Sequence, residues 1–502
     1  MKKLTRRTLI SLAALLPVIR VNAAVSGRFD VIVVGAGIAG LAAAVSAAEN
    51  GAKRVLVLEK GPMIGGHAIY ADGTVSAVYP RLQKVFNIKD SPELMAKQIW
   101  EWGDRDGDLS LIRVMARESG PAIDWLRGMG VHFRDWVFVP YPSNFPRGLT
   151  SHPTRGGYEY IRALNRRARA LHVEVRLNTR VVQLLRSGGA VTGVSASGPE
   201  GVERFYAPSV VLATGGFSAN PDMIRRYSHI KNPGTHSSAN PGGRHFDGAT
   251  GDGIQLGTAV GAALAEMPYI EFIPFRGGRL LEYVGGDIFV NSKGERFVDE
   301  GVSHPKLTEA LSHQPGGTMW VITDSQSVKG TTVTHKLMTG QVRKAANIDE
   351  MARIMDIDPE VLKKTISRYN SFVRKGRDDD FGKTIFTQEI KVPPYYFGVE
   401  YQDPHYTNGG IRINTKAEAL NTAGLVKPRA ALKGRSVRAE WPSRTAWFSG
   451  GSRGGKPRGG SLKNKRRTYR ISRRLTQKCA ADQTSHSVTF SPISSIFSCF
   501  PS

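Results

Sequence analysis

The sequence predicts an α/β fold in which helices flank a parallel sheet. The run from Asp30 to Val34 is continuously apolar and β-branched after its first residue, which is typical of a strand buried on both faces. The Ala-rich stretch from Leu41 to Ala48 indicates a helix. A second apolar run, from Arg54 to Leu58, completes the strand–helix–strand unit through which parallel strands are joined.

The turn between the first strand and the helix has the order Gly-x-Gly-x-x-Gly. Such glycines tighten the turn, let the backbone approach a pyrophosphate on the helix N-terminus, and let helix and strand pack closely. Glu59 ends the second strand about 20 residues past the last glycine, where a ribose-binding carboxylate is expected. The unit predicts dinucleotide binding, with an ordinary glycine-containing turn as the alternative. We expect cofactor contacts from Gly35, Ala36, Gly37, Ala39 and Gly40.

Further motif segments lie along the chain: Met63 to His67, Asn178 to Val182, Ala213 to Gly216, Thr250 to Gly253, Gly294 to Glu300 and His405 to Gly410. With them, the chain from Phe29 to about Gly424 resembles the flavoprotein subunits of the fumarate reductase and succinate dehydrogenase superfamily, and the soluble flavocytochrome c type most. The resemblance implies FAD rather than NAD. It also implies a two-dinucleotide-binding-fold FAD domain with an inserted α+β capping domain.

The resemblance assigns the remaining cofactor contacts. It implies a glycine pair that passes under the flavin, a strand whose backbone meets the adenine, and further turns on the cofactor side. The residues that match these positions are Glu59, Lys60, Gly65, Gly66, His67, Val182, Ala213, Thr214, Gly215 and Asp252. No metal site is expected.

The family reaction moves hydride between flavin N5 and a carbon–carbon bond beside an electron-withdrawing group. His405 and Tyr406 stand in the string with which the family grips its substrate, although a hinge between domains would also use this string. His304 stands where fumarate reductases have a proton-donating arginine, and imidazole is a common general acid. A surface histidine before a proline is the alternative. Glu282 matches an acidic residue of the family's proton path.

Departures from the pattern argue against fumarate as the substrate. His304 replaces the arginine, Ile273 replaces a family histidine, and a C-terminal arginine turn is absent. We therefore expect a periplasmic FAD-dependent oxidoreductase that acts on a carbon–carbon bond of an unsaturated acid or ketone. The alternatives are a dehydrogenase of the ketosteroid or tricarballylate type, an inactive relic, and a protein that binds nucleic acid or membrane through its tail.

The N-terminus has the features of an export signal. Met1 to Arg7 is basic, Leu9 to Ile19 is apolar, and Val21 to Ala23 fits a processing site. Thr5 to Ile10 resembles the twin-arginine signature. The apolar run is shorter than the roughly 20 residues that span a bilayer, so export to the periplasm is expected rather than an anchor.

The C-terminal tail departs from the family. From Leu425 to Ser502 it carries seventeen Lys and Arg against two acids, so +15 of the formal +26 lies there, with both cysteines. Codons that could encode Trp441 to Gly454, when they are read two bases later, can encode the sequence of a helix that relatives have. A frameshift shortly after Gly424 is the leading interpretation, and a basic arm or another variable tail are the alternatives. We expect an irregular or disordered segment.

The body of the chain, with 40% hydrophobic and 22% charged residues overall, has the composition of a globular protein. It lacks a Cys-x-x-Cys-His haem motif. A reductase would then need a separate carrier such as a periplasmic c-type cytochrome, whereas an oxidase would return electrons to oxygen. No nucleic acid and no membrane span are expected.

The expected segments are 1–24 signal peptide, 25–267 first part of the FAD-binding domain, 268–406 capping domain, 407–424 return to the FAD-binding domain, and 425–502 basic tail. Apolar spacing predicts helices over 111–128, 158–171 and 359–375, and strands over 173–185, 191–197, 209–212 and 286–291. Arg374 to Asp380 is expected to form a solvated surface turn.

Overall fold

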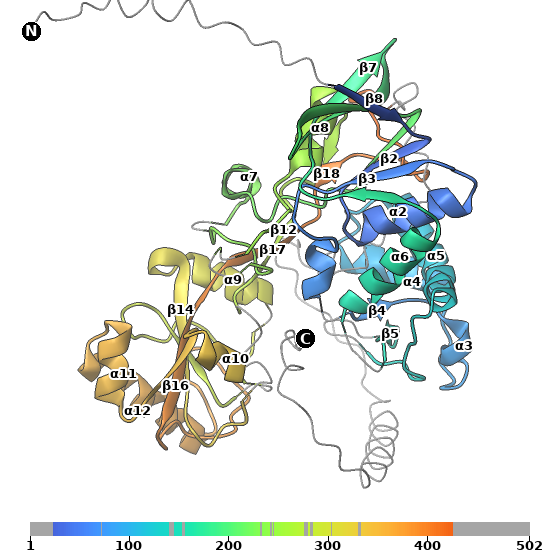
Figure 1. The fold of residues 1–502 in the computed structure, drawn as a ribbon. Coiled ribbons are helices and arrows are strands. Elements are labelled where there is room, and N and C mark those ends of the chain that lie inside the picture. The colour runs from blue at the N-terminus through green and yellow to red at the C-terminus, as the bar shows by residue number, and fades with distance from the viewer. Residues whose placement is uncertain are drawn as a thin grey trace, which may run out of the picture.

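The computed structural model has a larger and a smaller lobe, joined by two neighbouring strands (Figure 1). It describes residues 24–424, apart from 72, 140–144, 153–155, 231–232, 241–242, 244, 276–279, 282–284, 303 and 330–332. The predicted signal peptide, except its last residue, and the basic tail lie outside the described residues.

A parallel sheet forms the centre of the larger lobe. Its strands, in order across the sheet, are β10 (Ser209–Leu212), β2 (Val31–Val34), β3 (Val55–Leu58) and β6 (Glu174–Arg176). Every residue of β2 and β3 is buried, as their uniform apolar character requires. Helices α2 (Ile38–Glu49) and α6 (Tyr158–Ala170) contribute to one core with the side chains of Val33 and Val57. The predicted strand–helix–strand unit is confirmed.

An antiparallel layer covers the other face of this sheet. Its strands, in order, are β1 (Ala24–Arg28), β9 (Gly201–Tyr206), β8 (Ala190–Gly198) and β7 (Arg180–Ser187), with β1 parallel to β9. Ile32 and Leu56 of the parallel sheet share a core with Val194 and Phe205 of this layer. The larger lobe is therefore a three-layer arrangement with the parallel sheet in the middle.

The predicted strand over 173–185 is wrong in one respect, because it is two strands that belong to different sheets. The chain turns between β6 and β7 at Asn178, whose φ of 50° is left-handed. Asn178 N–H donates to the Gly61 carbonyl at 2.9 Å, and Thr179 N–H donates to the Glu59 carbonyl at 2.8 Å. The turn is thus fixed by the end of β3, a partner far away in sequence.

The remaining elements of the larger lobe are η1 (Gly66–Tyr70), β4 (Val75–Ser76), α3 (Pro80–Gln83), α4 (Pro92–Trp102), α5 (Leu109–Gly128), β5 (Gly148–Leu149), α7 (Pro221–Tyr227), α8 (Asp252–Ala259), β11 (Leu264–Ala265) and β18 (Gly410–Ile411). The predicted helices over 111–128 and 158–171 correspond to α5 and α6. Helix α5 begins earlier than predicted because the Asp108 carboxylate caps it, accepting the N–H groups of Ser110 and Leu111.

The smaller lobe, residues 274–402, has an antiparallel sheet with helices on both faces. Its strands, in order, are β13 (Ile288–Val290), β14 (Thr318–Thr323), β16 (Tyr395–Tyr401) and β15 (Val342–Ala345). Its helices are α9 (His304–Ser312), η3 (Pro315–Gly317), α10 (Val333–Met338), α11 (Ile348–Met355) and α12 (Pro359–Lys375). The predicted helix over 359–375 matches α12, which starts after the Asp358 cap and ends at Gly376.

The expected solvated turn over 374–380 is wrong for Asp378, whose side chain is buried. Arg296 donates to Glu300 at 2.8 Å and to Asp378 at 2.9 Å, and Lys383 donates to Glu300 at 2.8 Å. Burial raises the pKa of Glu300, but the charges of Lys383 and Arg296 outweigh it and hold that pKa below its ordinary value. This cluster ties the turn to the β13 end of the sheet.

Strands β12 (Ile270–Ile273) and β17 (Asp403–Thr407) pair antiparallel and connect the two lobes (Figure 1). Their register shifts: Glu271 pairs with Tyr406, and Phe272 pairs with Pro404. His405 is therefore the extra residue of a β-bulge, a device that redirects side chains. None of the helices in the described part of the chain has the length and apolar character needed to cross a membrane.

Candidate active site

A cavity of about 1770 Å³ lies in the larger lobe, above the carboxyl ends of β2, β3 and β10. Ordinary small-molecule pockets measure roughly 300–1000 Å³, so this cavity has room for a dinucleotide and a substrate. Its wall also takes residues from η1, α4, α5 and α8 and the segment from Tyr406 to Glu418. Open α/β sheets bind their ligands at this edge.

The first glycine turn forms one wall, and its three glycines have different surroundings. A Cβ at Gly35, whose φ is +101°, would lie 2.5 Å from the Ala213 carbonyl oxygen. A Cβ at Gly40 would lie 1.9 Å from the Gly35 carbonyl oxygen, so Gly40 allows α2 to pack on the turn. A Cβ at Gly37 would meet no atom of the described residues within 4 Å, and Gly37 lines the cavity. At Gly37 a ligand in the cavity can therefore come close to the backbone.

Helix α2 starts at this turn with its N-terminus on the cavity. No side chain of the described residues caps it, and Gly37, Ile38 and Ala39 all line the cavity. Its first N–H groups and its dipole therefore favour an anion there. Ala36 and Gly40 lie behind the wall.

Glu59 supports the turn from the end of β3. Its carboxylate accepts the N–H of Ala36 and the N–H of Gly61, both at 2.8 Å. The side chain is buried, and it also lines the cavity. Each carboxylate oxygen has two lone pairs, so these bonds leave acceptor capacity toward a ribose.

The second glycine pair lies directly against the first turn. Gly65 forms a β-bridge with Gly37, and its N–H donates to the Ala36 carbonyl at 2.9 Å. Gly65 and Gly66 have φ values of +115° and +52°, conformations that glycine adopts without strain. Gly65, Gly66 and His67 all line the cavity.

His67 is held by a carboxylate from a distant loop. Its Nε2 lies 2.7 Å from Asp247 Oδ1, and Asp247 also accepts the Ser237 hydroxyl and the Ala249 N–H. Burial raises the pKa of Asp247, but the hydrogen bonds from His67 and Ser237 outweigh it and lower that pKa to about 2. The aspartate is thus a fixed negative charge beside the cavity.

The segment after β10 forms the opposite wall. Ala213 N–H donates to the Val34 carbonyl at 2.8 Å, which continues the sheet. Gly215 has a φ of +73°, and a Cβ there would meet nothing in the described structure within 4 Å. A Cβ at Gly253 would lie 2.2 Å from Thr214 Oγ1, so the start of α8 packs on this segment. Ala213, Thr214 and Gly215 line the cavity.

Asp252 opens α8 and is surrounded by donors. Its carboxylate lies 3.2 Å from Lys60 Nζ and 3.1 Å from Arg180 Nε, and it accepts the Thr250 hydroxyl at 2.6 Å. Burial raises the pKa of Asp252, but these partners lower it below its ordinary value. Lys60 and Asp252 line the cavity together with Thr179, Arg180 and Val181. The next residue, Val182, has a half-exposed side chain.

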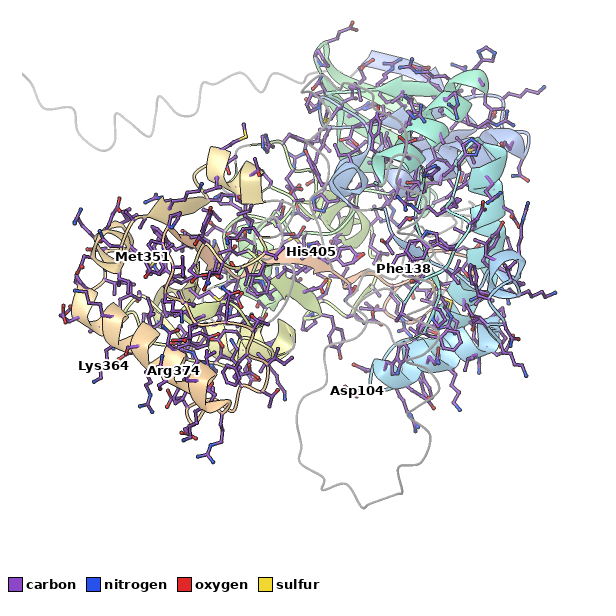
Figure 2. All side chains as sticks on the ribbon, turned by 90° about the horizontal axis from the view of Figure 1, so that it is seen from below. Asp104, Phe138, Met351, Lys364, Arg374 and His405 are labelled. Atoms are coloured by element: carbon purple, nitrogen blue, oxygen red, sulfur yellow. The ribbon has the colours of Figure 1, made fainter. Side chains whose placement is uncertain are left out.

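His405 and Tyr406 lie where the two lobes meet. Tyr406 lines the cavity, and the rings of His405 and Tyr406 are 5.9 Å apart. His405 Nδ1 lies 2.5 Å from the Ser238 hydroxyl. Figure 2 places His405 between the lobes, with Met351, Lys364 and Arg374 on the smaller lobe and Asp104 and Phe138 on the larger one.

The other two predicted catalytic residues are not brought to this point by described contacts. His304 is the first residue of α9, and its side chain lies outside the described structure. Glu282 also lies outside the described residues. Among the residues that are described, no group of three His, Cys, Asp or Glu side chains is arranged to hold a metal ion.

Sequence reasoning missed three residues that the structure brings to the site. Asp247 and Ser238 hold the two histidines, and Arg412 lines the cavity. Arg412 lies in the segment that follows Gly410. The only hint of its place in the site was that it is an arginine, and therefore a cation. Asp247 and Ser238 had no signal, because they come from an irregular loop.

The cavity fits an extended anionic dinucleotide. It combines an uncapped helix N-terminus, glycine positions that are open to the cavity, and a carboxylate at the end of the second strand. Together the parallel sheet and this wall define a dinucleotide-binding protein. The chain belongs to the FAD binding domain family, which it matches over residues 30–428.

Relatives support the same assignment. The chain is 33% identical over 411 residues to a fumarate reductase (cytochrome) of Shewanella frigidimarina, covering 80% of this chain and 70% of that protein. It is 33% identical over 419 residues to a urocanate reductase of Eggerthella lenta, covering 78% of this chain and 67% of the relative. The open conformation of a flavocytochrome c3 fumarate reductase matches with a TM-score of 0.72 and 27% identity, over 85% and 74% of the two chains.

These findings confirm the predicted fold class, the predicted family and FAD as the cofactor. They also confirm an FAD-dependent oxidoreductase that acts on carbon–carbon bonds.

Proposed function

We propose that this enzyme reduces a carbon–carbon double bond that is conjugated to a carboxylate or carbonyl group. The observation that carries the proposal is that Tyr406 lines the FAD cavity and that the ring of His405, its neighbour on the strand that joins the lobes, lies 5.9 Å from the Tyr406 ring. Bound FAD supplies the hydride chemistry. The protein then has to hold the substrate's polar end and deliver a proton.

His405 and Tyr406 are the groups we propose for the polar end. An imidazole N–H and a phenol O–H both donate hydrogen bonds to a carboxylate or carbonyl oxygen. Negative charge grows on that oxygen when the double-bond carbon farther from the carboxylate or carbonyl group accepts hydride, so donors aimed at the oxygen lower the barrier. Arg412, which also lines the cavity, is a cation that we propose adds to this grip.

For the proton, His304 and Glu282 remain the proposed residues. Either group supplies a titratable proton, and His304 opens α9 at the junction side of the smaller lobe. We also propose the division into an FAD-binding domain, 25–267 with 407–424, and a capping domain, 268–406.

The substrate class follows from the relatives and from the departures. Fumarate, urocanate and acrylate, named for three relatives, all carry a double bond next to a carboxylate. His304 stands in place of the family's proton-donating arginine, Ile273 stands in place of a family histidine, and the C-terminal arginine turn, which would bind a carboxylate, is absent. An acid or ketone with one electron-withdrawing group is therefore favoured over fumarate.

Location and electron donor are part of the proposal. The basic, apolar and small-residue order of 1–24, with a twin-arginine pair, supports export of the folded protein to the periplasm. A separate c-type cytochrome would then deliver electrons, as the word cytochrome in the name of one relative suggests.

The test is reoxidation of the photoreduced, FAD-loaded protein by a panel of unsaturated acids and enones. His405→Gln and Tyr406→Phe should each lower the rate with the best substrate at least tenfold. His229→Gln and Tyr158→Phe, at exposed positions, are matched controls that should leave it unchanged. Turnover by His405→Gln at the normal rate would contradict the assignment, and an inert panel would contradict the substrate class.

A further inference from the structure

The loop before α8 brings Ser238 to the ring of His405. The Ser238 hydroxyl lies 2.5 Å from His405 Nδ1, and Ser238 is only 3% exposed. The serine end of this hydrogen bond is shielded from water, which favours a lasting contact between the hydroxyl and the ring over exchange of the hydroxyl with solvent. The ring nitrogen that contacts Ser238 is therefore defined by the fold.

The backbone of this loop is held by two hydrogen bonds against the chain just before His405. Gly234 N–H donates to the Gln402 carbonyl at 2.7 Å, and Ser238 N–H donates to the Pro404 carbonyl at 3.0 Å. A Cβ at Gly234 would lie 2.6 Å from the Gln402 carbonyl oxygen, so the two backbones are in close contact. Ser238 is thus placed by backbone bonds that do not depend on its own side chain.

The strand carries the matching distortion. His405 is the extra residue of the bulge between the pairs Glu271–Tyr406 and Phe272–Pro404. A bulge turns its extra residue out of the normal alternation and is frequent next to active sites. Here the bulge directs the imidazole toward Ser238 and keeps it next to the Tyr406 ring.

We propose that Ser238 is a positioning residue that sets the tautomer of His405. The arrangement we propose is that its hydroxyl donates to Nδ1, so that Nδ1 is the acceptor and the proton of the neutral ring is on Nε2. His405 then acts toward the substrate as an Nε2–H donor, suited to a carboxylate or carbonyl oxygen. The proposal rests on the substrate-binding role of His405 proposed above, and it names the atom through which that role is exercised.

The direct test is the ¹⁵N spectrum of the histidine rings in the full FAD-loaded chain, without substrate. The His405 signals are those that His405→Gln removes. The wild type should show a protonated Nε2 and an unprotonated Nδ1, and Ser238→Ala should move both signals toward the average of two tautomers. A wild-type ring protonated at Nδ1 when neutral would overturn the proposal, as would an unchanged spectrum in Ser238→Ala.

Kinetics supply the second readout. Loss of one hydrogen bond to a neutral group predicts that Ser238→Ala lowers kcat/KM about tenfold, and Ser238→Thr, which keeps the hydroxyl, should restore most of it. Ser371→Ala, on the exposed side of α12, is the matched control. Full activity in Ser238→Ala would overturn the proposal. If no substrate is found, the proposed function fails, whereas the spectrum still decides the role of Ser238.

Discussion

The carboxylate of Glu59 accepts the backbone N–H of Ala36 at 2.8 Å, so the end of β3 fixes the shape of the glycine turn that follows β2. The same carboxylate accepts the Gly61 N–H at 2.8 Å. Glu59 therefore belongs to the framework of the empty protein as well as to the predicted contact with the ribose.

Glu59→Ala should lower the stability of the FAD-free protein by about 2–3 kcal/mol, because it leaves two backbone N–H groups without their charged acceptor. FAD affinity should fall as well, since the turn loses its support. Urea unfolding of the apo-protein and a flavin fluorescence titration measure the two effects. Glu174→Ala, at an exposed pair with Arg176, is the control. Unchanged stability of the apo-protein would show that the two hydrogen bonds to Glu59 do not stabilise the fold.

Gly37→Val and Gly40→Val should have opposite consequences. The valine at 37 projects into the cavity, so the apo-protein should keep its melting temperature while FAD binding is lost. The valine at 40 would collide with the Gly35 carbonyl, so the protein itself should be destabilised or fail to fold. Thermal melts of apo-protein and flavin absorbance after purification distinguish them. A Gly37→Val protein that purifies yellow would exclude this pyrophosphate site.

Asp247 should make stability depend on acid pH. Its pKa is lowered from 3.8 to about 2 in the folded protein, so its contribution is complete above pH 3.8 and is lost as pH falls through 2. The contribution is about 2 kcal/mol, since each pKa unit corresponds to about 1.4 kcal/mol. Unfolding curves measured between pH 5 and 2 should show this loss of stability in the wild type and in the exposed control Asp222→Asn. The Asp247→Asn variant should not show it.

Arg296→Met should destabilise the smaller lobe by about 3–5 kcal/mol, because it leaves the buried carboxylates of Glu300 and Asp378 short of their shared cation. Arg374→Met removes an exposed pair with Glu389 and should cost less than about 1 kcal/mol. Urea midpoints of the FAD-loaded proteins provide the comparison. Equal midpoints for the two variants would contradict the importance of the buried cluster.

Features whose physical cause is local were predictable from the sequence. The glycine turn needs only neighbouring strand and helix patterns, and α12 is bounded by its own cap residues, Asp358 and Gly376. The strand break at Asn178 was not predictable, because the groups that fix it are the carbonyls of Glu59 and Gly61. A period-2 pattern carries no information about which sheet a strand will join.

The site shows the same division. Gly35, Gly37 and Glu59 lie within one βαβ unit, and their spacing alone pointed to a nucleotide. His67 and His405 were recognised as candidates, but their partners Asp247 and Ser238 come from a loop about 180 and 170 residues away. Charge-rich segments mislead in a similar way, since Asp378 looks solvated until Arg296 is placed beside it.

The chain leaves the larger lobe through β12 and returns through β17, its direct neighbour. Both crossings therefore occupy one ribbon, and in the described structure no strand between residues 274 and 402 joins the sheet that carries the glycine turn. An insert attached in this way can be exchanged between homologues at two cuts that lie side by side.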